Sequence, residues 1–505
     1  MFESFKEHSV AEFFKKNRQM LGFSGKIRSL TTIVHEYVTN SLDACEEAGI
    51  LPDIKVEVKE IAESRYKIKV EDNGPGIPKK HLGKALGMML AGTKFHRYLQ
   101  QRGQQGIGAA GATMYGVITT GNPVHAISGY KGKIIECDIY VDFKTNNPIL
   151  SNIKEKDGEF RGLIVEGEFG DVKYEKSNYG AYEYLRRTAL VNPHAKIIFI
   201  DPSGEESLFP RSSEQIPPRP KEINPHPLGI SAQDLLDIAV HETEFRRISS
   251  FLQNRFSRVG LNKVSEIKDL IPDIDLNKDP KGLDWDEAQK IVEAFKKVKW
   301  IAPSSEGINP IGKELIEKSF ENILHPEVIA VSERKTRIYR GGIPFIVEAG
   351  IAFGGGIKDA NKKGEIMRFA NRAPLLFDAG ACAITESVKE IDWKRYDLKN
   401  FEEEPIVVLV NISSVHIPYV GAGKQSISSE DDVKSEIKFA IMEAARDIQR
   451  YISGKRKKHE SETKKKVIGR YAHQLSKDLT ELAENKDSKN IEKRLNDMIE
   501  NKYIG

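Results

Sequence analysis

Three polar side chains in the stretch HEYVTNSLDACEEAG, residues 35–49, have residue types and spacing that could do chemistry. Glu36, Asn40 and Asp43 follow one another at intervals of four and three residues, which places them on one face of a helix. A carboxylate such as Glu36 can orient a water and take its proton. The amide oxygen of Asn40 is a ligand that Mg²⁺ accepts beside phosphates and waters. Asp43 could orient a water or a lid residue. Taken alone, the pattern is also typical of a solvated polar face.

The second candidate segment is DNGPGIP, which follows a strand-like run of alternating residues. Asp72 ends that run, so its carboxylate could accept a hydrogen bond from the exocyclic amine of adenine. Gly74 and Gly76 would let a flat base approach the backbone. By itself, this segment is equally a plain turn.

The third segment, RGQQGIGAAG, places Gly103, Gly106 and Gly108 ahead of an apolar, helix-forming run. Free amides at a helix N-terminus and the helix dipole both favour phosphate, so the segment predicts an anion site. A second phosphate motif, GINPIGKE from Gly307, has the spacing of a P-loop but carries Glu314 at the magnesium-binding position and Pro310 within the loop. We therefore do not expect a P-loop there.

In this order, the three segments resemble the motifs of the GHKL ATPase superfamily, which includes gyrase-type topoisomerases, MutL, the ninety-kilodalton heat-shock chaperone and histidine kinases. The resemblance implies Glu36 as general base, Asn40 as Mg²⁺ ligand, Asp72 as adenine reader and a glycine-rich lid around the triphosphate of ATP. The nucleotide contacts that it implies are Asn40, Asp43, Asp72, Gly74, Gly76, Thr93, Lys94, Gly103, Gln104, Gln105, Gly106, Ile107, Gly108, Ala109 and Ala110.

One position departs from the superfamily pattern. Its last motif usually has a Gly-Thr pair whose threonine supports the adenine-binding aspartate. The best match in this chain, RGLIVEGEF, has Gly162 followed by Leu163. The support for Asp72 is either lost or supplied from elsewhere in the chain.

A closer resemblance, over nearly the whole chain, is to the B subunits of type IIB DNA topoisomerases, the topoisomerase VI family. It rests on the N-terminal run from SVAEFFKKN to EEAGILP, on PHPLG, on PFIVEAGIAFGG and RFANRAPLL, and on HIPYVGAGKQSI. The last of these implies that Lys424 is a switch lysine. A lysine on a glycine-bordered loop is a mobile point charge that can reach a γ-phosphate from another domain.

The fold class that follows is α+β, with a GHKL (Bergerat) ATPase α/β sandwich, a small helix–two-turns–helix domain, and an α/β transducer domain with a long C-terminal stalk helix. Proline-rich residues 210–229 mark a linker, and apolar residues at helical spacing after Asp431 predict the stalk. The expected domains are an N-terminal arm at 1–20, the ATPase domain at 21–225, the helical domain at 226–304, the transducer at 305–430, and the stalk with its tail at 431–505.

Composition narrows the class of protein. The 505 residues are 39% hydrophobic and 30% charged, with a formal charge of +3, so a nucleic-acid partner has to be argued from local patches. No apolar run is long enough for a membrane span. Three scattered cysteines form neither a disulfide framework nor a metal site. We expect a cytoplasmic protein with no membrane partner.

The resemblance implies that two B subunits bind ATP, dimerise through the ATPase domain, and drive double-strand passage with a DNA-cleaving topoisomerase VI A subunit in an A₂B₂ heterotetramer. Double-stranded DNA could touch the basic runs 455–458 and 464–466, although a solvated helix face fits them equally. For Arg255, Arg258 and Lys263 a structural role is favoured. The alternatives are another GHKL clamp of the MutL kind, a histidine kinase, or a non-catalytic scaffold for a cleavage subunit.

Overall fold

The computed structural model describes residues 9–90, 98–103, 106–301, 303, 307–360, 364–421, 423–482 and 488–503. The chain falls into two compact units. The larger comprises Met1–Ile391 and Pro405–Ala444, and the smaller comprises Asp392–Glu404 and Ala445–Gly505. Among the described residues, no helix has the length and apolar character needed to cross a bilayer.

The larger unit begins with two helices. Helix α1 (Val10–Lys16) starts at a capping box in which the Ser9 hydroxyl accepts from the Glu12 amide. Helix α2 (Lys26–Ala48) ends at Gly49, whose φ of 70° closes the helix in the left-handed conformation. Its apolar residues, Leu30, Ile33, Val34 and Val38, are buried, which confirms the predicted amphipathic helix.

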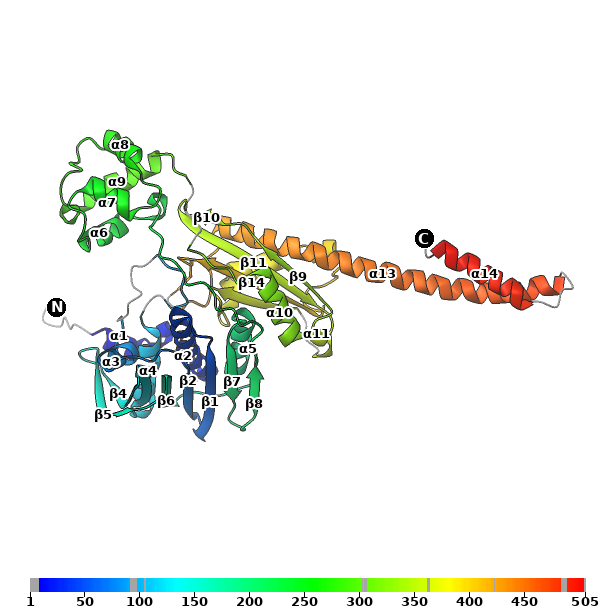
Figure 1. Ribbon diagram of the computed structural model, residues 1–505, viewed down its shortest axis with the longest axis horizontal. Helices are drawn as coiled ribbons and strands as arrows, with labels where there is room; N and C mark the ends of the chain where they lie inside the picture. The colour runs from blue at the N-terminus through cyan, green and yellow to red at the C-terminus, as the bar shows by residue number, and fades with distance from the viewer. Residues whose placement is uncertain are drawn as a thin grey trace, which may run out of the picture. The chain divides into compact units, whose positions relative to one another are not determined.

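An eight-stranded sheet forms the base of the first part of the chain (Figure 1). Its order is β5-β4-β3-β6-β2-β1-β7-β8, and every pair is antiparallel except β1 with β7. The strands are β1 (Asp53–Ala62), β2 (Arg65–Asp72), β3 (Val124–Tyr130), β4 (Lys133–Asp142), β5 (Asn147–Asp157), β6 (Gly162–Gly170), β7 (Lys196–Ile200) and β8 (Glu206–Phe209). The alternating or apolar sequences of β1, β2, β4, β6 and β7 predict strands there, whereas we predict none at β3, β5 or β8 from the sequence.

Helices α2, α3 (Lys79–Gly87), α4 (Gly108–Thr120) and α5 (Ala181–Val191) pack on this sheet. Strand β2 buries every second residue, and these residues join apolar side chains of the four helices in one core. The sheet is therefore half-buried, in the manner of an antiparallel layer covered by helices.

A separate apolar core holds the small helical part of the chain together. Its helices are α6 (Ala232–Val240), α7 (Ile248–Arg255), α8 (Leu261–Leu270) and α9 (Trp285–Lys297). Gly260, whose residue type predicts a break between helices, is the N-cap of α8. Arg255 donates to Glu242 at 2.7 Å, and Lys263 donates to Glu266 at 2.8 Å. These ion pairs agree with the structural role favoured for both cations.

The second sheet has six strands in the order β10-β11-β14-β12-β13, with β9 also paired to β11. Its strands are β9 (Val328–Glu333), β10 (Arg337–Tyr339), β11 (Ile343–Phe353), β12 (Glu365–Ala370), β13 (Ala373–Pro374) and β14 (Ile406–Ser414). Helices α10 (Lys313–Leu324), α11 (Gly356–Asp359) and α12 (Ala383–Lys389) belong to the same part of the chain. Every residue of β14 is buried, which explains why its sequence is almost continuously apolar.

A buried charge cluster joins α5 to the second sheet. Glu183 accepts from Arg186 at 2.8 Å and from Arg187 at 2.6 Å. Arg187 also donates to Glu365, the first residue of β12, at 2.9 Å. Burial alone would raise the pKa of Glu183, but the hydrogen bonds and charges of the two arginines outweigh it and lower the pKa to about 2.

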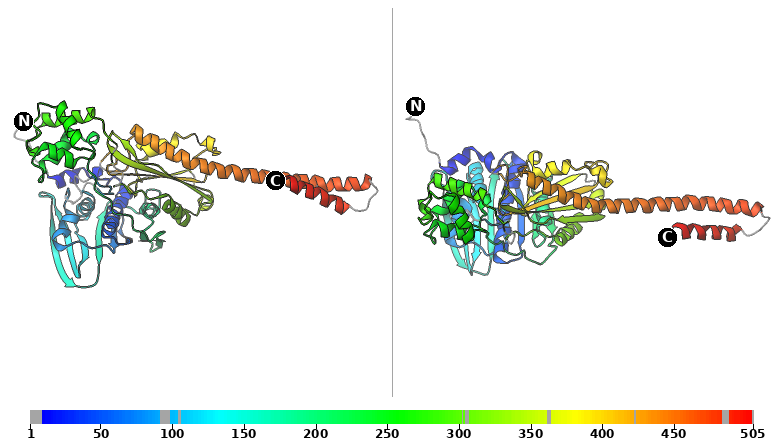
Figure 2. Two further views of the ribbon diagram at one scale, coloured as in Figure 1. Left: turned by 45° about the horizontal axis from the view of Figure 1, so that its top comes forward. Right: turned by 90° about the horizontal axis from the view of Figure 1, so that it is seen from above.

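The smaller unit holds the distal part of α13 (Asp431–Leu482) and helix α14 (Ser488–Tyr503). Helix α14 runs back beside α13 in all three ribbon views (Figures 1 and 2), and His473 lies 2.8 Å from Glu492 across the pair. Within this unit, Ser453 of α13 donates to Asp397 at 2.6 Å. The long helix predicted after Asp431 is confirmed.

The charge cluster generates a prediction of pH dependence. Glu183→Gln should lower the free energy of unfolding at pH 7 by about 3 kcal/mol, because two buried guanidinium groups lose their shared carboxylate. The folded-state pKa of Glu183 is lowered from 4.5 to about 2, so its contribution is present above pH 4.5 and is lost as the pH falls towards 2. Urea unfolding of both proteins at pH 7 and pH 3 measures the difference.

The matched control is Glu175→Gln, which removes an exposed ion pair with Lys173 and should change stability by less than about 0.5 kcal/mol. A Glu183→Gln deficit of equal size at both pH values would contradict the assignment.

Candidate active site

A cavity of about 620 Å³ lies in the larger unit between α2, the eight-stranded sheet and the start of α4. This volume is in the range of small-molecule sites. Four of the sequence-predicted residues from distant segments line it: Glu36, Asn40, Asp72 and Lys424. The structure thus brings together groups separated by almost four hundred residues in the sequence.

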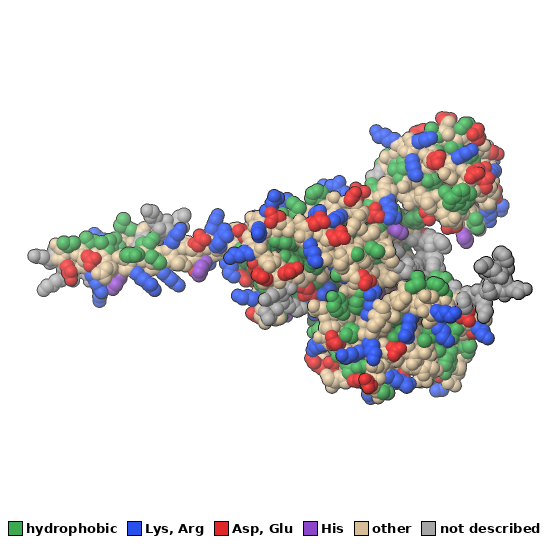
Figure 3. Space-filling view, turned by 180° about the vertical axis from the view of Figure 1, so that it is seen from behind, with side chains coloured by type: hydrophobic (Ala, Val, Ile, Leu, Met, Phe, Trp, Pro, Cys, Tyr) green, Lys and Arg blue, Asp and Glu red, His purple; other side chains and the backbone are tan. Residues whose placement is uncertain are grey.

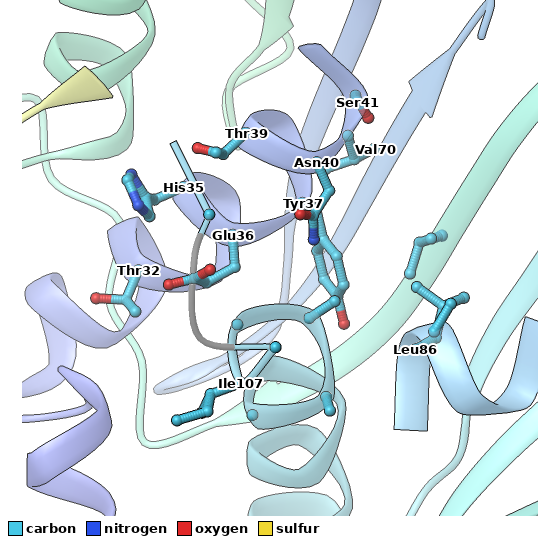
Figure 4. Close-up of a pocket in the computed structure, with 18 of the residues that line it drawn as sticks. Thr32, His35, Glu36, Tyr37, Thr39, Asn40, Ser41, Val70, Leu86 and Ile107 are labelled. Atoms are coloured by element: carbon cyan, nitrogen blue, oxygen red, sulfur yellow. The ribbon is translucent and has the colours of Figure 1, made fainter. Parts of the chain in front are cut away.

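Helix α2 presents Glu36 and Asn40 to the cavity, one helical turn apart. Figure 4 shows both side chains projecting from α2, with the Glu36 carboxylate between this helix and Ile107. Asn40 is exposed and Glu36 is partly exposed, so both can meet a ligand and water.

Asp43 does not line the cavity, although it was expected among the nucleotide contacts. It is buried, and its carboxylate accepts from Arg102 at 2.7 Å. Arg102 opens the glycine-rich segment, so this pairing matches the alternative that Asp43 orients a lid residue. The three polar residues of α2 therefore have different surroundings. Glu36 and Asn40 line the cavity, and Asp43 pairs with the buried guanidinium of Arg102.

Asp72 is held by three donors, none of them a threonine. The Ser41 hydroxyl donates to Oδ2 at 2.7 Å, and the amides of Gly74 and Leu163 donate to Oδ1 at 2.9 and 3.2 Å. Burial raises the pKa of Asp72, and these hydrogen bonds oppose the shift. The support that the sequence lacks at Leu163 is thus supplied by a serine of α2 and by the backbone of residue 163 itself.

The turn after Asp72 requires glycine for a steric reason. Gly76 lines the cavity with φ of 71°, and a Cβ there would lie 2.1 Å from the Gly129 carbonyl oxygen. Gly74, also expected as a nucleotide contact, does not line the cavity, and its amide is used by Asp72.

The glycine-rich segment closes another side of the cavity. Its described residues that line the cavity are Arg102, Gly103, Gly106, Ile107, Gly108, Ala109, Ala110 and Gly111. Helix α4 begins at Gly108 without a side-chain cap, so its first amides are available to an anion. A Cβ on Gly108 would lie 1.8 Å from Glu36 Oε2, so a larger residue there would have to displace the Glu36 carboxylate. The expected contacts Thr93, Lys94, Gln104 and Gln105 lie outside the described residues.

Lys424 reaches the cavity from the loop between β14 and α13, with Gly423 and Gln425 beside it. Its backbone has φ of 51°, a left-handed conformation that is uncommon for a lysine and is often found at functional sites. Burial lowers the pKa of the neighbouring His35, Glu36 partly opposes this shift, and the Lys424 charge adds to it. The balance of these effects favours the neutral imidazole of His35.

Arg102 also connects the glycine-rich segment to α2 and, through Asn192 at the end of α5, to the second sheet. Its guanidinium donates to Glu46 at 2.7 Å and to Asn192 at 2.6 Å. Asn192 in turn donates to the Arg372 carbonyl at 3.1 Å. The residues just before Arg102 are also bonded to a distant segment, because Gln100 donates to the Asn309 carbonyl at 2.9 Å.

The segment GINPIGKE, which has only the spacing of a P-loop, uses two of its amides for hydrogen bonds inside the protein. The backbone N–H groups of Ile311 and Gly312 donate to the buried carboxylate of Glu348 at 3.0 and 2.7 Å. Both amides are thus already occupied by an internal carboxyl group.

Sequence reasoning did not single out Ser41, Arg102 or Arg28, which also line the cavity. Ser41 lies in the segment HEYVTNSLDACEEAG and Arg102 in RGQQGIGAAG, so their place within these motifs could have marked them as site residues. Arg28 offered none, because its partner, Asp378, is 350 residues away.

The cavity is lined by a helix-borne carboxylate and by a glycine-rich segment at a helix N-terminus, an arrangement that suits a nucleotide-binding ATPase. In agreement, residues 25–139 match the family model of histidine kinase-, DNA gyrase B- and HSP90-like ATPases. Residues 303–465 match the model of the transducer of the topoisomerase VI B subunit.

Curated relatives carry the comparison across nearly the whole chain. The B subunit of type 2 DNA topoisomerase 6 from Methanothermobacter thermautotrophicus is 47% identical over 96% of this chain and 94% of its own length. Those of Pyrococcus horikoshii and Pyrococcus abyssi are 43% and 44% identical, each over 95% of this chain and 92% of their own lengths. The chain belongs to the family of type 2 DNA topoisomerase 6 B subunits, the ATP-driven subunits of a type II DNA topoisomerase.

The geometry around Asp72 predicts the effect of Ser41→Ala. Removing the hydroxyl leaves Oδ2 without its donor, so adenine-nucleotide affinity should fall by about tenfold, the equivalent of one hydrogen bond to a charged group. Titration with a fluorescent ATP analogue measures this change.

Thr31→Val is the matched control. Thr31 is also buried on α2 and donates to the Tyr179 carbonyl at 2.9 Å, but it does not line the cavity. An equal loss of affinity in both variants would mean that Ser41 acts through the stability of α2 and not through Asp72.

Proposed function

We propose that this chain binds ATP with Mg²⁺ in the cavity and hydrolyses it, and that this drives dimerisation and DNA strand passage in an A₂B₂ assembly with a topoisomerase VI A subunit. The observation that carries the proposal is the meeting of Glu36, Asn40, Asp72 and Lys424 at one cavity. These four residues supply a base, a metal ligand, a purine acceptor and a cation, which together match the chemistry of a nucleoside triphosphate.

Glu36 is the proposed general base. Its carboxylate lies beside the N-terminus of α4, close to the position that a Cβ on Gly108 would occupy. A phosphoryl group bound at the α4 amides would therefore lie next to this carboxylate. A water between them can be oriented by Glu36 and can lose its proton to it as attack begins.

Asn40 is the proposed protein ligand of Mg²⁺. The fit is good because Mg²⁺ takes few ligands from protein and the rest from phosphates and water, and Asn40 is an exposed oxygen donor on the cavity wall. Among the described residues, no cluster of three or more His, Cys, Asp or Glu side chains forms a rival metal site. When bound, Mg²⁺ would neutralise charge on the phosphate oxygens.

Asp72 and Gly76 form the proposed adenine end. The three donors to Asp72 fix its carboxylate, which can accept from the amine of adenine. The absence of a side chain at Gly76 lets the base lie against the backbone.

Lys424 is the proposed sensor of the γ-phosphate. It comes from a loop that follows the second sheet, so a bond from its ammonium group to the terminal phosphate would join that sheet to the nucleotide. Loss of the phosphate on hydrolysis would remove the bond, the usual logic of a phosphate-sensing switch.

The proposed A subunit would need a docking surface on the chain. The outer part of α13 carries exposed apolar side chains about one turn apart: Val467, Tyr471, Leu475, Leu479 and Leu482. Figure 3 shows hydrophobic side chains gathered along this arm. Such a stripe is typical of a surface that a partner covers. The basic residues at 455–458 and 464–466 lie on the same helix and are the proposed contacts for double-stranded DNA.

The role of Glu36 is tested by Glu36→Ala. The variant should bind an ATP analogue with affinity within about threefold of the parent while turnover falls by a factor of about 100 or more, as expected for loss of a general base. Glu47→Ala, on the same helix but away from the cavity, is the control. Hydrolysis near the parental rate in Glu36→Ala would remove Glu36 from the role of base.

The assembly is tested by relaxation and decatenation of plasmid DNA. The purified chain should show neither activity alone, and both should appear when ATP and the candidate A subunit are added. Analytical ultracentrifugation of the mixture should show two copies of each subunit. If ATP changes nothing in the mixture, the proposed strand passage is wrong.

A further inference from the structure

Arg28, in the first turn of α2, forms a forked ion pair with Asp378, which follows β13 of the second sheet. Its Nη1 donates to Asp378 Oδ1 at 3.0 Å and its Nη2 donates to Oδ2 at 2.9 Å. Two parallel bonds fix direction as well as distance, which a lysine could not do. The pair therefore fixes the loop at 377–378 against the edge of the nucleotide cavity, which Arg28 itself lines.

The same loop is bonded to the residue after Lys424. The Phe377 amide donates to Gln425 Oε1 at 3.2 Å. Arg368, buried on β12, donates to the carbonyls of Phe377 and Gln425 at 2.8 and 3.2 Å. Residues 377–378 and 424–425 thus form one bonded unit.

Ring contacts set the orientation of the guanidinium. Arg28 lies 4.7 Å from the centroid of the Phe377 ring, and Tyr179 stacks on that ring with centroids 6.0 Å apart. Arg28 Nη2 also lies 3.9 Å from the position of a Cβ on Gly423. Its Nε is buried and, among the described residues, has no hydrogen-bond partner. The fork and the ring therefore hold the guanidinium in place despite this desolvated donor.

The Lys424 loop needs support from outside itself. Gly421 and Gly423 precede the lysine at short range, and Lys424 has a left-handed backbone. Asp378 is left-handed as well, with φ of 55°, a conformation that aspartate tolerates better than most residues. A loop of this composition has many accessible conformations, so contacts with Gln425 and Phe377 decide which one is populated.

We propose that Arg28 and Asp378 form a latch that positions the Lys424 loop against the nucleotide cavity, and that both are positioning residues for ATP hydrolysis. This inference rests on the proposed role of Lys424. The latch would join the start of the helix that carries Glu36 to the loop that carries Lys424. It would therefore set the relative position of the base and the sensor of the terminal phosphate.

The test is a double-mutant cycle on steady-state ATP hydrolysis by the full chain, with Arg28→Gln, Asp378→Asn and their combination. Each single variant should lower kcat by about fivefold and change KM for ATP by less than about twofold, because the latch positions a group and does not bind ground-state nucleotide. The combined variant should lose no more than either single variant, since both remove the same interaction. Asn at 378 keeps the left-handed backbone accessible.

Asp171→Asn is the matched control. Asp171 also has φ of 55° and pairs with an arginine, Arg18, at 3.5 Å, but neither residue lines the cavity. Its kcat should equal that of the parent. Thermal melting of every variant shows whether folding is preserved, and Arg28→Lys, which keeps the charge without the fork, replaces Arg28→Gln if that variant does not fold.

Three outcomes would overturn the latch. An unchanged kcat in both single variants removes its role in hydrolysis. Losses that multiply in the combined variant show that the two residues act independently. A large rise in KM for Arg28→Gln alone shows direct contact between Arg28 and the nucleotide.

Lys424→Ala, measured in parallel, separates failure of the latch from failure of the proposed switch. If Lys424→Ala hydrolyses ATP at the parental rate, the switch is wrong, and the latch, which acts through it, is wrong too. If Lys424→Ala is slow while the latch variants are not, only the latch is wrong.

Discussion

Burial of the Arg102 guanidinium is the constraint on which the arrangement of the site depends. A buried cation must be paired on several sides. An unpaired buried charge costs more free energy than most single contacts in a protein contribute. Its partners, Asp43 and Glu46 on α2 and Asn192 after α5, come from separate elements. The glycine-rich segment, α2 and the end of α5 are thereby held to one common point.

This junction gives the proposed mechanism two routes between nucleotide and second sheet. One runs through the Lys424 loop, whose cation reaches the cavity directly. The other runs through the glycine-rich segment, because Gln100 and Arg102 are bonded, directly or through Asn192, to the backbone of Asn309 and Arg372. A change in the phosphate loop would therefore act on the second sheet even before the terminal phosphate is lost.

The sequence predicted those features whose signal is local. Alternation located β1 and β2, and a buried apolar run located β14, whereas β5 escaped notice because most of its residues are exposed and polar and it is defined by pairing with β4. At the site, motif order brought Glu36, Asn40 and Asp72 together. The donors to Asp72 and the partner of Asp43 depend on contacts between distant segments, which spacing along one segment does not encode.

Helix α2 also fixes the distance between two groups of the site. Glu36, at the proposed phosphate end of the cavity, and Ser41, which donates to the Asp72 carboxylate at the proposed adenine end, are separated by about 7.5 Å of rise along the helix axis. Inserting a single residue between them would turn Ser41 by about 100° about that axis. The number of residues between Glu36 and Ser41 thus sets both the distance and the angle between the two ends of the site. The loops around the cavity do not change this distance.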